Sequence, residues 1–133
     1  MANQSVSTSL CSPLTFTSPT ILGTHFLGVT ASPVSNYSLD VLQDSNFNGG
    51  PVSVRGANFC NVTVTYTHPG QNDIINVKAW LSIDIYNRHL QAVGGSGFVA
   101  GRFIISYNNI AAAISEAYAT ISTNAGLSVN PVD

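Results

Sequence analysis

The sequence predicts an α/β fold, and three features of its second half carry that prediction. Between residues 60 and 68, β-branched and aromatic side chains alternate with threonines, which is typical of a half-buried strand. From residue 107 to 118, apolar side chains recur at helical spacing, and strand-like segments precede and follow this stretch. A strand, a helix and another strand in succession imply parallel pairing through a right-handed crossover. The order therefore indicates a sheet covered by a helix.

The chain is expected to divide near residue 60. Residues 1–59 contain four prolines and the turn-forming Asn48-Gly49-Gly50, so a turn-rich segment of short strands is expected there. Residues 60–133 contain the regular elements and are expected to form the first strands and the first helix of the sheet. With 133 residues, the chain fits one domain or part of one.

The first two regular strands are predicted to form an antiparallel hairpin. Residues 60–68 form one arm and residues 74–81 form the other. Pro69-Gly70 lies between them and can reverse the chain, because proline presets one turn dihedral and glycine accepts a positive φ. This hairpin leads into the parallel strands that follow.

A strand over residues 89–93 is predicted to run into a glycine-rich loop, a helix and a last strand. Asn108 or Asn109 is suited to the helix N-cap, because an asparagine side chain accepts hydrogen bonds from unpaired backbone N–H groups. The last strand, residues 118–123, is expected to lie at an open parallel edge of the sheet, where it would favour aggregation.

Composition favours a secreted protein that binds neither nucleic acid nor a membrane. Only 8% of the residues are charged, the net charge is −2, and the four basic residues are scattered, so no basic patch for nucleic acid is present. No run approaches the ~18 apolar residues that span a bilayer, and no signal-peptide pattern is visible. Cys11 and Cys60 form an even pair, which favours a disulfide in an oxidising compartment over two buried thiols. N-glycosylation triplets begin at Asn3, Asn36 and Asn61.

The glycine-rich stretch Leu90–Gly101 is the main candidate for chemistry, and several interpretations of it are open. Residues 95–100 match a dinucleotide-binding pattern, but the next strand ends without the acid that binds a ribose. Ser96 comes close to a nucleophile motif, yet Phe98 occupies a position that calls for a small residue, and nothing marks any of the three histidines as its base. A plain glycine turn packed under a helix is a further interpretation.

The remaining interpretation is a loop that binds an oxyanion. In α/β-hydrolases, one oxyanion donor comes from the loop between the third strand and the first helix. Gly94, Gly95, Ser96 and Gly97 occupy that place in the predicted order. Glycines let a substrate carbonyl approach the backbone N–H groups, each worth roughly 3–4 kcal/mol in the transition state. The cysteines and histidines lack metal-ligand spacing, so no metal site is expected.

Residues 59–81, 90–103 and 111–127 resemble the fungal tannase and feruloyl esterase family of secreted serine esterases. The upstream segments CSPLTF and ASPVSNYS are similar to the N-terminal region of that family. The resemblance implies an α/β-hydrolase core with a large inserted lid that often carries calcium. It also implies a Ser–Asp–His triad that hydrolyses esters of aromatic acids, a disulfide between Cys11 and Cys60, and an oxyanion loop at residues 94–97.

The resemblance places the triad, the lid and its calcium beyond residue 133. The chain is therefore expected to be an N-terminal fragment of a carboxylic ester hydrolase, without a cofactor of its own and inactive by itself. Two alternative functions are a small secreted binding or structural domain without catalysis, and a dinucleotide-binding module.

The chain departs from the family pattern at four positions. Arg88 and Ala117 stand where the family has glycines, Asn124 replaces an aspartate, and Ser96 interrupts a run of glycines. The resemblance thus implies an altered turn before the strand at residues 89–93.

Overall fold

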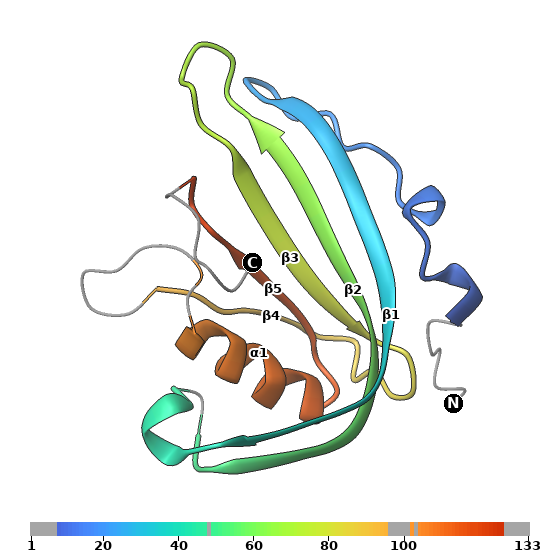
Figure 1. Cartoon of the computed structure of the whole chain (residues 1–133), viewed down its shortest axis with the longest axis vertical. Helices are drawn as coiled ribbons and strands as arrows, with labels where there is room; N and C mark the ends of the chain where they lie inside the picture. The colour runs from blue at the N-terminus through green and yellow to red at the C-terminus, as the bar shows by residue number, and fades with distance from the viewer. Residues whose placement is uncertain (1–7, 48, 96–101, 103, 127–133) are drawn as a thin grey trace.

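A computed structural model describes residues 8–47, 49–95, 102 and 104–126. Five strands form one sheet in the spatial order β1-β2-β3-β5-β4, with one α-helix packed against it (Figure 1). This mixed sheet with its helix agrees with the predicted α/β class. The elements in chain order are the 3₁₀ turns η1 (Thr8–Leu10) and η2 (Pro13–Thr15), β1 (His25–Val41), the 3₁₀ turn η3 (Gln43–Ser45), β2 (Val52–Thr67), β3 (Ile75–Ser82), β4 (Leu90–Ala92), α1 (Ile104–Ser115) and β5 (Ala119–Thr123).

The predicted hairpin is confirmed. β2 and β3 pair antiparallel from Phe59 opposite Ser82 to Tyr66 opposite Ile75. Between them, the N–H of Gln71 donates to the carbonyl of His68 over 3.0 Å, and Gly70 has a φ of 85°. Proline followed by a glycine with positive φ is the pattern of a type II turn, so local turn chemistry sets the register of this hairpin.

The predicted parallel pair is also confirmed, but the expected position of its last strand is wrong. β5 pairs parallel with β4 and antiparallel with β3, so it lies inside the sheet, and β4 is the outer strand (Figure 1). A crossover makes its two strands parallel neighbours, but it does not decide on which side of the first strand the second one lies. The backbone edge of β3 that the hairpin leaves unpaired decides it here, because β5 fills that edge.

The expected short strands before residue 60 are replaced by one long ribbon. β1 spans 17 residues and β2 spans 16, so β2 begins at Val52 and continues past the expected division at residue 60. Pro33 does not interrupt β1, because β1 is an outer strand and a proline is tolerated where a backbone edge has no partner strand.

Irregular pairing bends this ribbon around the helix. The register between β1 and β2 shifts between Val34 and Tyr37 and again before Leu39. Asn36 and Gly56 have positive φ values of 56° and 62°, and the N–H of Asn36 donates to Oδ1 of Asn58 over 2.9 Å. Such bulges increase the local bend of a strand pair. The C-terminal part of β1 and the N-terminal part of β2, which pair with each other, therefore curve underneath α1 (Figure 1).

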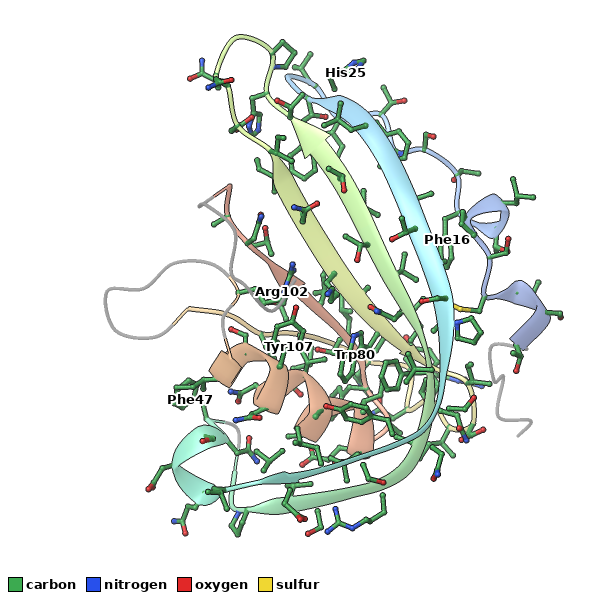
Figure 2. The ribbon with its side chains drawn as sticks, viewed as in Figure 1. Phe16, His25, Phe47, Trp80, Arg102 and Tyr107 are labelled. Carbon is green, nitrogen blue, oxygen red and sulfur yellow. A yellow bond between two sulfur atoms is a disulfide. The ribbon has the colours of Figure 1, made fainter. Side chains whose placement is uncertain are left out.

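The core lies between this curved ribbon, β3 and α1. The rings of Phe59 and Trp80 stack with their centroids 4.1 Å apart, and Tyr37 meets both edge-on. Ile110 and Ile114 of α1 pack on this aromatic cluster, where Figure 2 labels Trp80. Aromatic pairs in these geometries contribute roughly 0.5–1.5 kcal/mol beyond their burial, so the cluster fixes the helix on the sheet.

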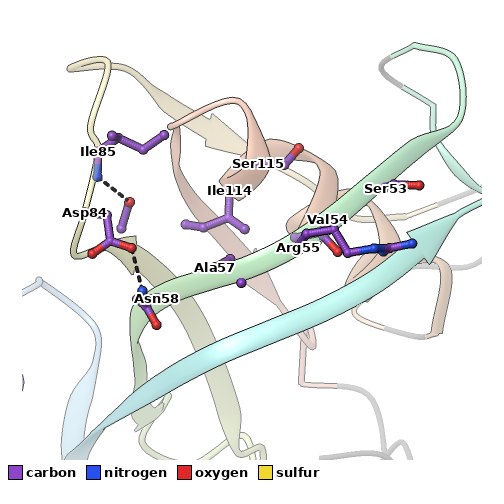
Figure 3. Close-up of a pocket in the computed structure, with 11 residues that line it drawn as sticks. Ser53, Val54, Arg55, Ala57, Asn58, Asp84, Ile85, Ile114 and Ser115 are labelled. Atoms are coloured by element: carbon purple, nitrogen blue, oxygen red, sulfur yellow. Dashed lines mark hydrogen bonds between the residues drawn. The ribbon is translucent and has the colours of Figure 1, made fainter.

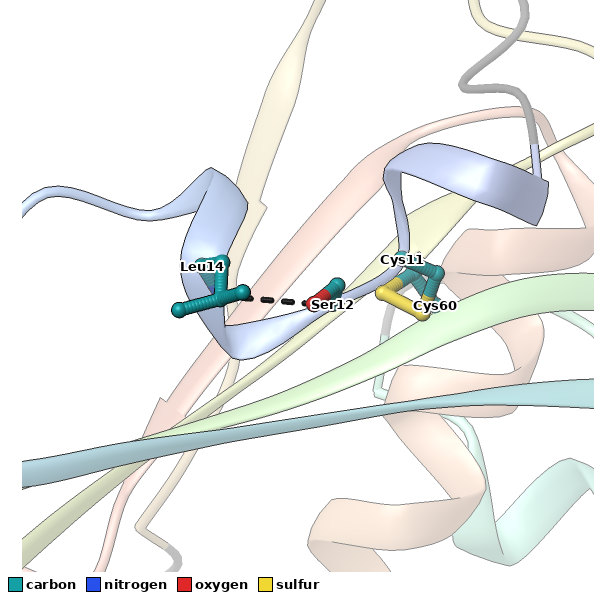
Figure 4. Close-up of a disulfide and its surroundings, with 4 residues drawn as sticks. All are labelled: Cys11, Ser12, Leu14 and Cys60. Carbon is teal, nitrogen blue, oxygen red and sulfur yellow. Dashed lines mark hydrogen bonds between the residues drawn. A yellow bond between two sulfur atoms is a disulfide. The ribbon is translucent and has the colours of Figure 1, made fainter.

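The opposite face of the sheet carries the disulfide. Side chains alternate along β2, so Cys60 and Val62 point away from Phe59 and α1. Cys60 is bonded to Cys11, and Phe16 packs on the same cluster, so the N-terminal segment is attached to this face (Figure 4). The pairing that the family resemblance implies is thus present, and closing this loop stabilises the fold by roughly 4 kcal/mol.

The helix begins earlier than predicted. α1 starts at Ile104, so Asn108 and Asn109 lie inside it and neither caps it. Asn109 instead connects two elements: its Nδ2 donates to the carbonyls of Ser45 (3.2 Å) and Ile105 (2.8 Å), and its Oδ1 accepts from the N–H of Phe47 (2.9 Å). A long-range contact with η3, which the sequence pattern does not show, therefore uses the side chain that the prediction assigned to a cap.

The helix ends in a Schellman motif with an unusual residue at its centre. The N–H of Tyr118 donates to the carbonyl of Ala113 and that of Ala117 to Ile114, each over 3.1 Å. Ala117 has a φ of 67°, a left-handed value that this motif normally assigns to glycine. Arg88 likewise has a φ of 69°. Both positions where the resemblance implies a lost glycine are therefore left-handed in the folded chain.

Replacing these two residues by glycine should stabilise the protein. A left-handed residue with a Cβ is strained by roughly 1–2 kcal/mol, and the greater freedom of unfolded glycine offsets part of the gain. Ala117→Gly should therefore raise the free energy of unfolding by about 1 kcal/mol, and Arg88→Gly should act in the same direction. Urea denaturation followed by circular dichroism measures both.

Asn108→Gly, inside α1, is the matched control for these variants. Glycine at a right-handed helical position should lower stability slightly. If Ala117→Gly destabilised the protein as Asn108→Gly does, the left-handed backbone would not be a source of strain.

Candidate oxyanion-binding site

The glycine loop starts at the carboxyl end of β4. Gly94 is exposed, and Gly95 is half-buried with a φ of 68°. A side chain at Gly95 would be strained by roughly 1–2 kcal/mol at this φ, so glycine is the favoured residue there. Ser96 and Gly97, the other two predicted loop residues, lie outside the described residues. Ligands of open α/β sheets bind outside the carboxyl ends of the parallel strands, and the loop lies at such an end.

A cavity of about 120 Å³ lies beside the two described glycines. Val93 and the glycines form one wall, Ser106 and Asn109 of α1 form another, and Phe47 comes from the loop after η3. The backbone of Gly94 and Gly95 therefore faces open space. The first turns of α1 contribute to the same cavity, and the partial positive charge at a helix N-terminus favours negative charge nearby.

Both ends of the loop are anchored to the sheet. At the near end, the N–H of Val93 donates to the carbonyl of Ile121 over 2.9 Å, which extends the parallel ladder. At the far end, Arg102 is only 4% exposed, and its guanidinium donates to the carbonyl of Ser122 and to Oη of Tyr107, each over 3.2 Å. Lys78 also donates to Oη of Tyr107 over 3.1 Å.

Sequence reasoning missed Phe47, Asn109 and Arg102 at this site. The side chain of Phe47 is 57% exposed, and its backbone is held by Asn109, which is 4% exposed. The two residues are 62 positions apart in the chain, so no local pattern connects them. Arg102 counted only as one of four scattered basic residues. Its burial on the sheet directly after the glycines is visible only in the folded chain (Figure 2).

The described residues do not assemble a serine–histidine pair. His25 is exposed at the start of β1, and the ring of His89 lies 6.2 Å from that of Tyr118. His68 has its Nδ1 2.6 Å from Oδ2 of Asp73, a carboxylate partner that the sequence did not indicate. None of these histidines hydrogen-bonds a serine hydroxyl within the described part of the chain. The described residues therefore contain no activated serine.

A second cavity, of about 290 Å³, lies where β2 passes the C-terminal end of α1 (Figure 3). Its floor is apolar, with Val54, Ala57 and Ile114. At one rim, Asn58 donates from Nδ2 to Oδ2 of Asp84 over 2.6 Å. No histidine is among its lining residues, so this cavity offers no histidine base to a nucleophile.

The remaining predicted sites are placed as follows. Asn36 is exposed in the bulge of β1, whereas Asn61 lies within β2 with its Oδ1 buried, and Asn3 is outside the described residues. Asn124 follows β5 directly and accepts hydrogen bonds from the N–H groups of Asn76 and Gly126, so an amide stands where a dinucleotide site needs an acid.

Neither a metal site nor a membrane-spanning helix is found in the part of the chain that the structure describes. No three histidine, cysteine, aspartate or glutamate side chains there lie close enough to hold a metal ion. No described helix has the length and apolar character needed to cross a bilayer.

Comparisons with known proteins were made at three levels. No family model matches the chain. A probable feruloyl esterase of Arthroderma benhamiae is 41% identical over 73 residues, which cover 54% of this chain and 13% of that protein. The tannase of Aspergillus oryzae is 35% identical over 82 residues, 59% of this chain and 12% of that protein. The structure of the tannin acyl hydrolase from Aspergillus niger superposes with a TM-score of 0.69 and 25% identity over 96% of this chain and 23% of that chain.

The resemblance to the fungal tannase and feruloyl esterase family is confirmed. The chain spans about an eighth of the length of the curated relatives it matches, so it corresponds to one part of such a protein. The structural match extends over nearly the whole chain, including the ribbon of β1 and β2. The fold described above, with β5 between β3 and β4, is therefore that of a chain similar to tannases.

The pair of His68 and Asp73 makes the hairpin end sensitive to acid. Hydrogen bonds from the ring and the backbone N–H of His68, followed by one from Thr67, lower the pKa of Asp73 to about 2. A carboxylate with a lowered pKa stabilises the fold fully above its unfolded value of ~3.9, and this contribution is lost as the pH falls through about 2.

The stability difference between the natural chain and Asp73→Asn should therefore be largest at pH 5 and should shrink as the pH falls toward 2. Urea unfolding of both proteins across this range measures it, and comparing the two removes the effect of the other carboxylates. A difference independent of pH would show that the charge of Asp73 does not contribute.

Proposed function

We propose that the chain supplies the oxyanion-binding part of a serine carboxylic ester hydrolase that acts on esters of aromatic acids. The observation that carries this proposal is the open backbone at Gly94 and Gly95, between β4 and α1, in a relative of tannases and feruloyl esterases. The sheet would then be the first part of an α/β-hydrolase core, in which the loop before the first helix donates to the oxyanion.

In this reaction, a serine oxygen attacks the ester carbonyl and turns its oxygen into an oxyanion. Backbone N–H groups at the loop would donate to that oxygen, and the acyl-enzyme forms when the alcohol leaves. A well-aimed donor of this kind contributes roughly 3–4 kcal/mol to the transition state, because it is oriented before the reaction. The anchors at Val93 and Arg102 would help to orient these donors, since they fix both ends of the loop.

The nucleophile, its base and the acid are assigned to no residue of this chain. The small-residue loop and its cavity are therefore one component of the catalytic site, and the rest would come from sequence that the longer relatives have. The disulfide between Cys11 and Cys60 fits an oxidising compartment, so we place the protein outside the cell.

The 133-residue chain by itself should hydrolyse no chromogenic aryl ester, because oxyanion donors without a nucleophile do not form an acyl-enzyme. Purified chain incubated with 4-nitrophenyl acetate should match the buffer rate. A serine-directed phosphonate should label no residue by mass spectrometry. Turnover that the phosphonate abolishes would instead reveal a complete active site within these residues.

The oxyanion role itself is tested in a chimera. In the feruloyl esterase of Arthroderma benhamiae, the matching segment is replaced by this chain, and hydrolysis of a feruloyl ester is followed. Gly95→Ala in the chimera should lower kcat by about 100-fold with little change in KM, because a misplaced donor acts mainly in the transition state.

Gly28→Ala is the matched control for the chimera. An added Cβ at Gly28 would meet no atom within 4 Å, so kcat should be unchanged. Equal activity of the Gly95 and Gly28 variants would remove the loop from the mechanism and favour the alternative, a binding or structural domain without catalysis.

A further inference from the structure

An apolar groove of about 460 Å³ lies on the sheet face opposite α1. Phe26, Val64, Tyr66 and Val77 line its floor, and they are cross-strand neighbours: Phe26 pairs with Tyr66 and Val64 with Val77. The groove lies at the end of the sheet where β1 begins, near His25 in Figure 2. Its volume falls within the range of small-molecule sites, which are mostly apolar with a few polar groups.

One wall of the groove is exposed and apolar. Leu22, in the segment before β1, has a relative exposure of 102% and lines the groove. Thr24, beside it, already donates its hydroxyl to the carbonyl of Ile21 over 2.9 Å. Large aliphatic side chains held at the surface next to an open groove favour contact with an apolar ligand.

His68 supplies the polar group of the groove. It follows Tyr66 by two positions, so it continues the same face, and its ring meets that of Tyr66 edge-on at 5.7 Å. Asp73 accepts from the backbone N–H of His68 over 2.8 Å, and its Oδ2 lies 2.6 Å from Nδ1 of the ring. The ring is thereby fixed in position, and the contacts of His68 within the described residues leave its Nε2 without a hydrogen-bond partner.

The carboxylate determines what Nε2 can do. Asp73 is ionised at neutral pH, as an ordinary aspartate is, and its hydrogen bonds lower its pKa further, to about 2. When the imidazole is neutral, the ionised carboxylate accepts its Nδ1–H, which leaves Nε2 as a hydrogen-bond acceptor. The groove thus offers apolar and aromatic walls together with one fixed acceptor.

We propose that this groove binds a small phenol, whose ring lies on Tyr66, Val64 and Leu22 and whose hydroxyl donates to Nε2 of His68. A phenol needs one acceptor and an apolar surface. The site is separate from Gly94 and Gly95, which lie beside α1, so the proposal is independent of the esterase function.

The test uses the whole chain and 4-ethylphenol as the probe. The ¹⁵N resonances of the His68 ring are followed by NMR during the titration. Saturable binding is expected with a Kd on the order of 1 mM, which suits a ligand of this size. 4-Ethylanisole has the same ring but no hydroxyl proton, so it should bind about tenfold more weakly. Equal binding of the two probes would overturn the proposal.

Two variants locate the site. Leu22→Asn removes the apolar wall and should weaken binding of 4-ethylphenol several-fold. Leu14→Asn is the matched control, because Leu14 is also exposed, at 96%, and does not line the groove. His68→Phe keeps a ring beside Tyr66 but removes the acceptor. This variant should bind 4-ethylphenol only as tightly as the natural chain binds 4-ethylanisole. Equal effects of the two leucine variants would overturn the proposal. Self-association in sedimentation experiments that Leu22→Asn abolishes would overturn it as well.

Discussion

The hydrogen bonds that hold β5 between β3 and β4 are the constraint on which the rest of the structure depends. Trp80 of β3 lies opposite Thr120, and Leu90 of β4 lies opposite Ala119, so neighbouring residues of β5 fix both partners. Among the strands of the described residues, the short β4 has no other partner. Because α1 must cross from the end of β4 to the start of β5, the same bonds also bring Ile110 and Ile114 onto Trp80.

The sequence predicts those features of the fold that neighbouring residues determine, and it does not predict those that depend on residues far apart in the chain. Period-two alternation and the Pro69-Gly70 turn are local, and the hairpin of β2 and β3 was predicted from them. The position of β5 depends on pairing with a strand 40 to 46 residues earlier, from Trp80 opposite Thr120 to Val77 opposite Thr123, and no local pattern records it. The sequence does not predict the length of β1, because prolines normally indicate the end of a strand, whereas an outer strand tolerates them.

The candidate site divides in the same way. Gly94 and Gly95 were predicted, because a glycine run after a strand has a distinctive composition and a known place in hydrolases. Phe47 and Asn109 were not, since the bond that joins them spans 62 residues. The even pair of cysteines and the resemblance to tannases both indicated the bond between Cys11 and Cys60, whereas the resemblance alone drew attention to Arg88 and Ala117, where it implies a glycine.

Those two replacements matter for the site because they share one junction with β4. Asn87 donates from its backbone N–H to the carbonyl of Ala117 over 2.9 Å and from Nδ2 to that of Glu116 over 3.0 Å, so the turn at Arg88 is bonded to the end of α1. Between this strained junction and Gly94 stand only β4 and its two flanking residues. A strand advances about 3.3 Å per residue, so Gly94 lies at most roughly 20 Å from Arg88. The hydrogen bond from Val93 to Ile121 and the anchor of Arg102 on the sheet then hold the two ends of the loop.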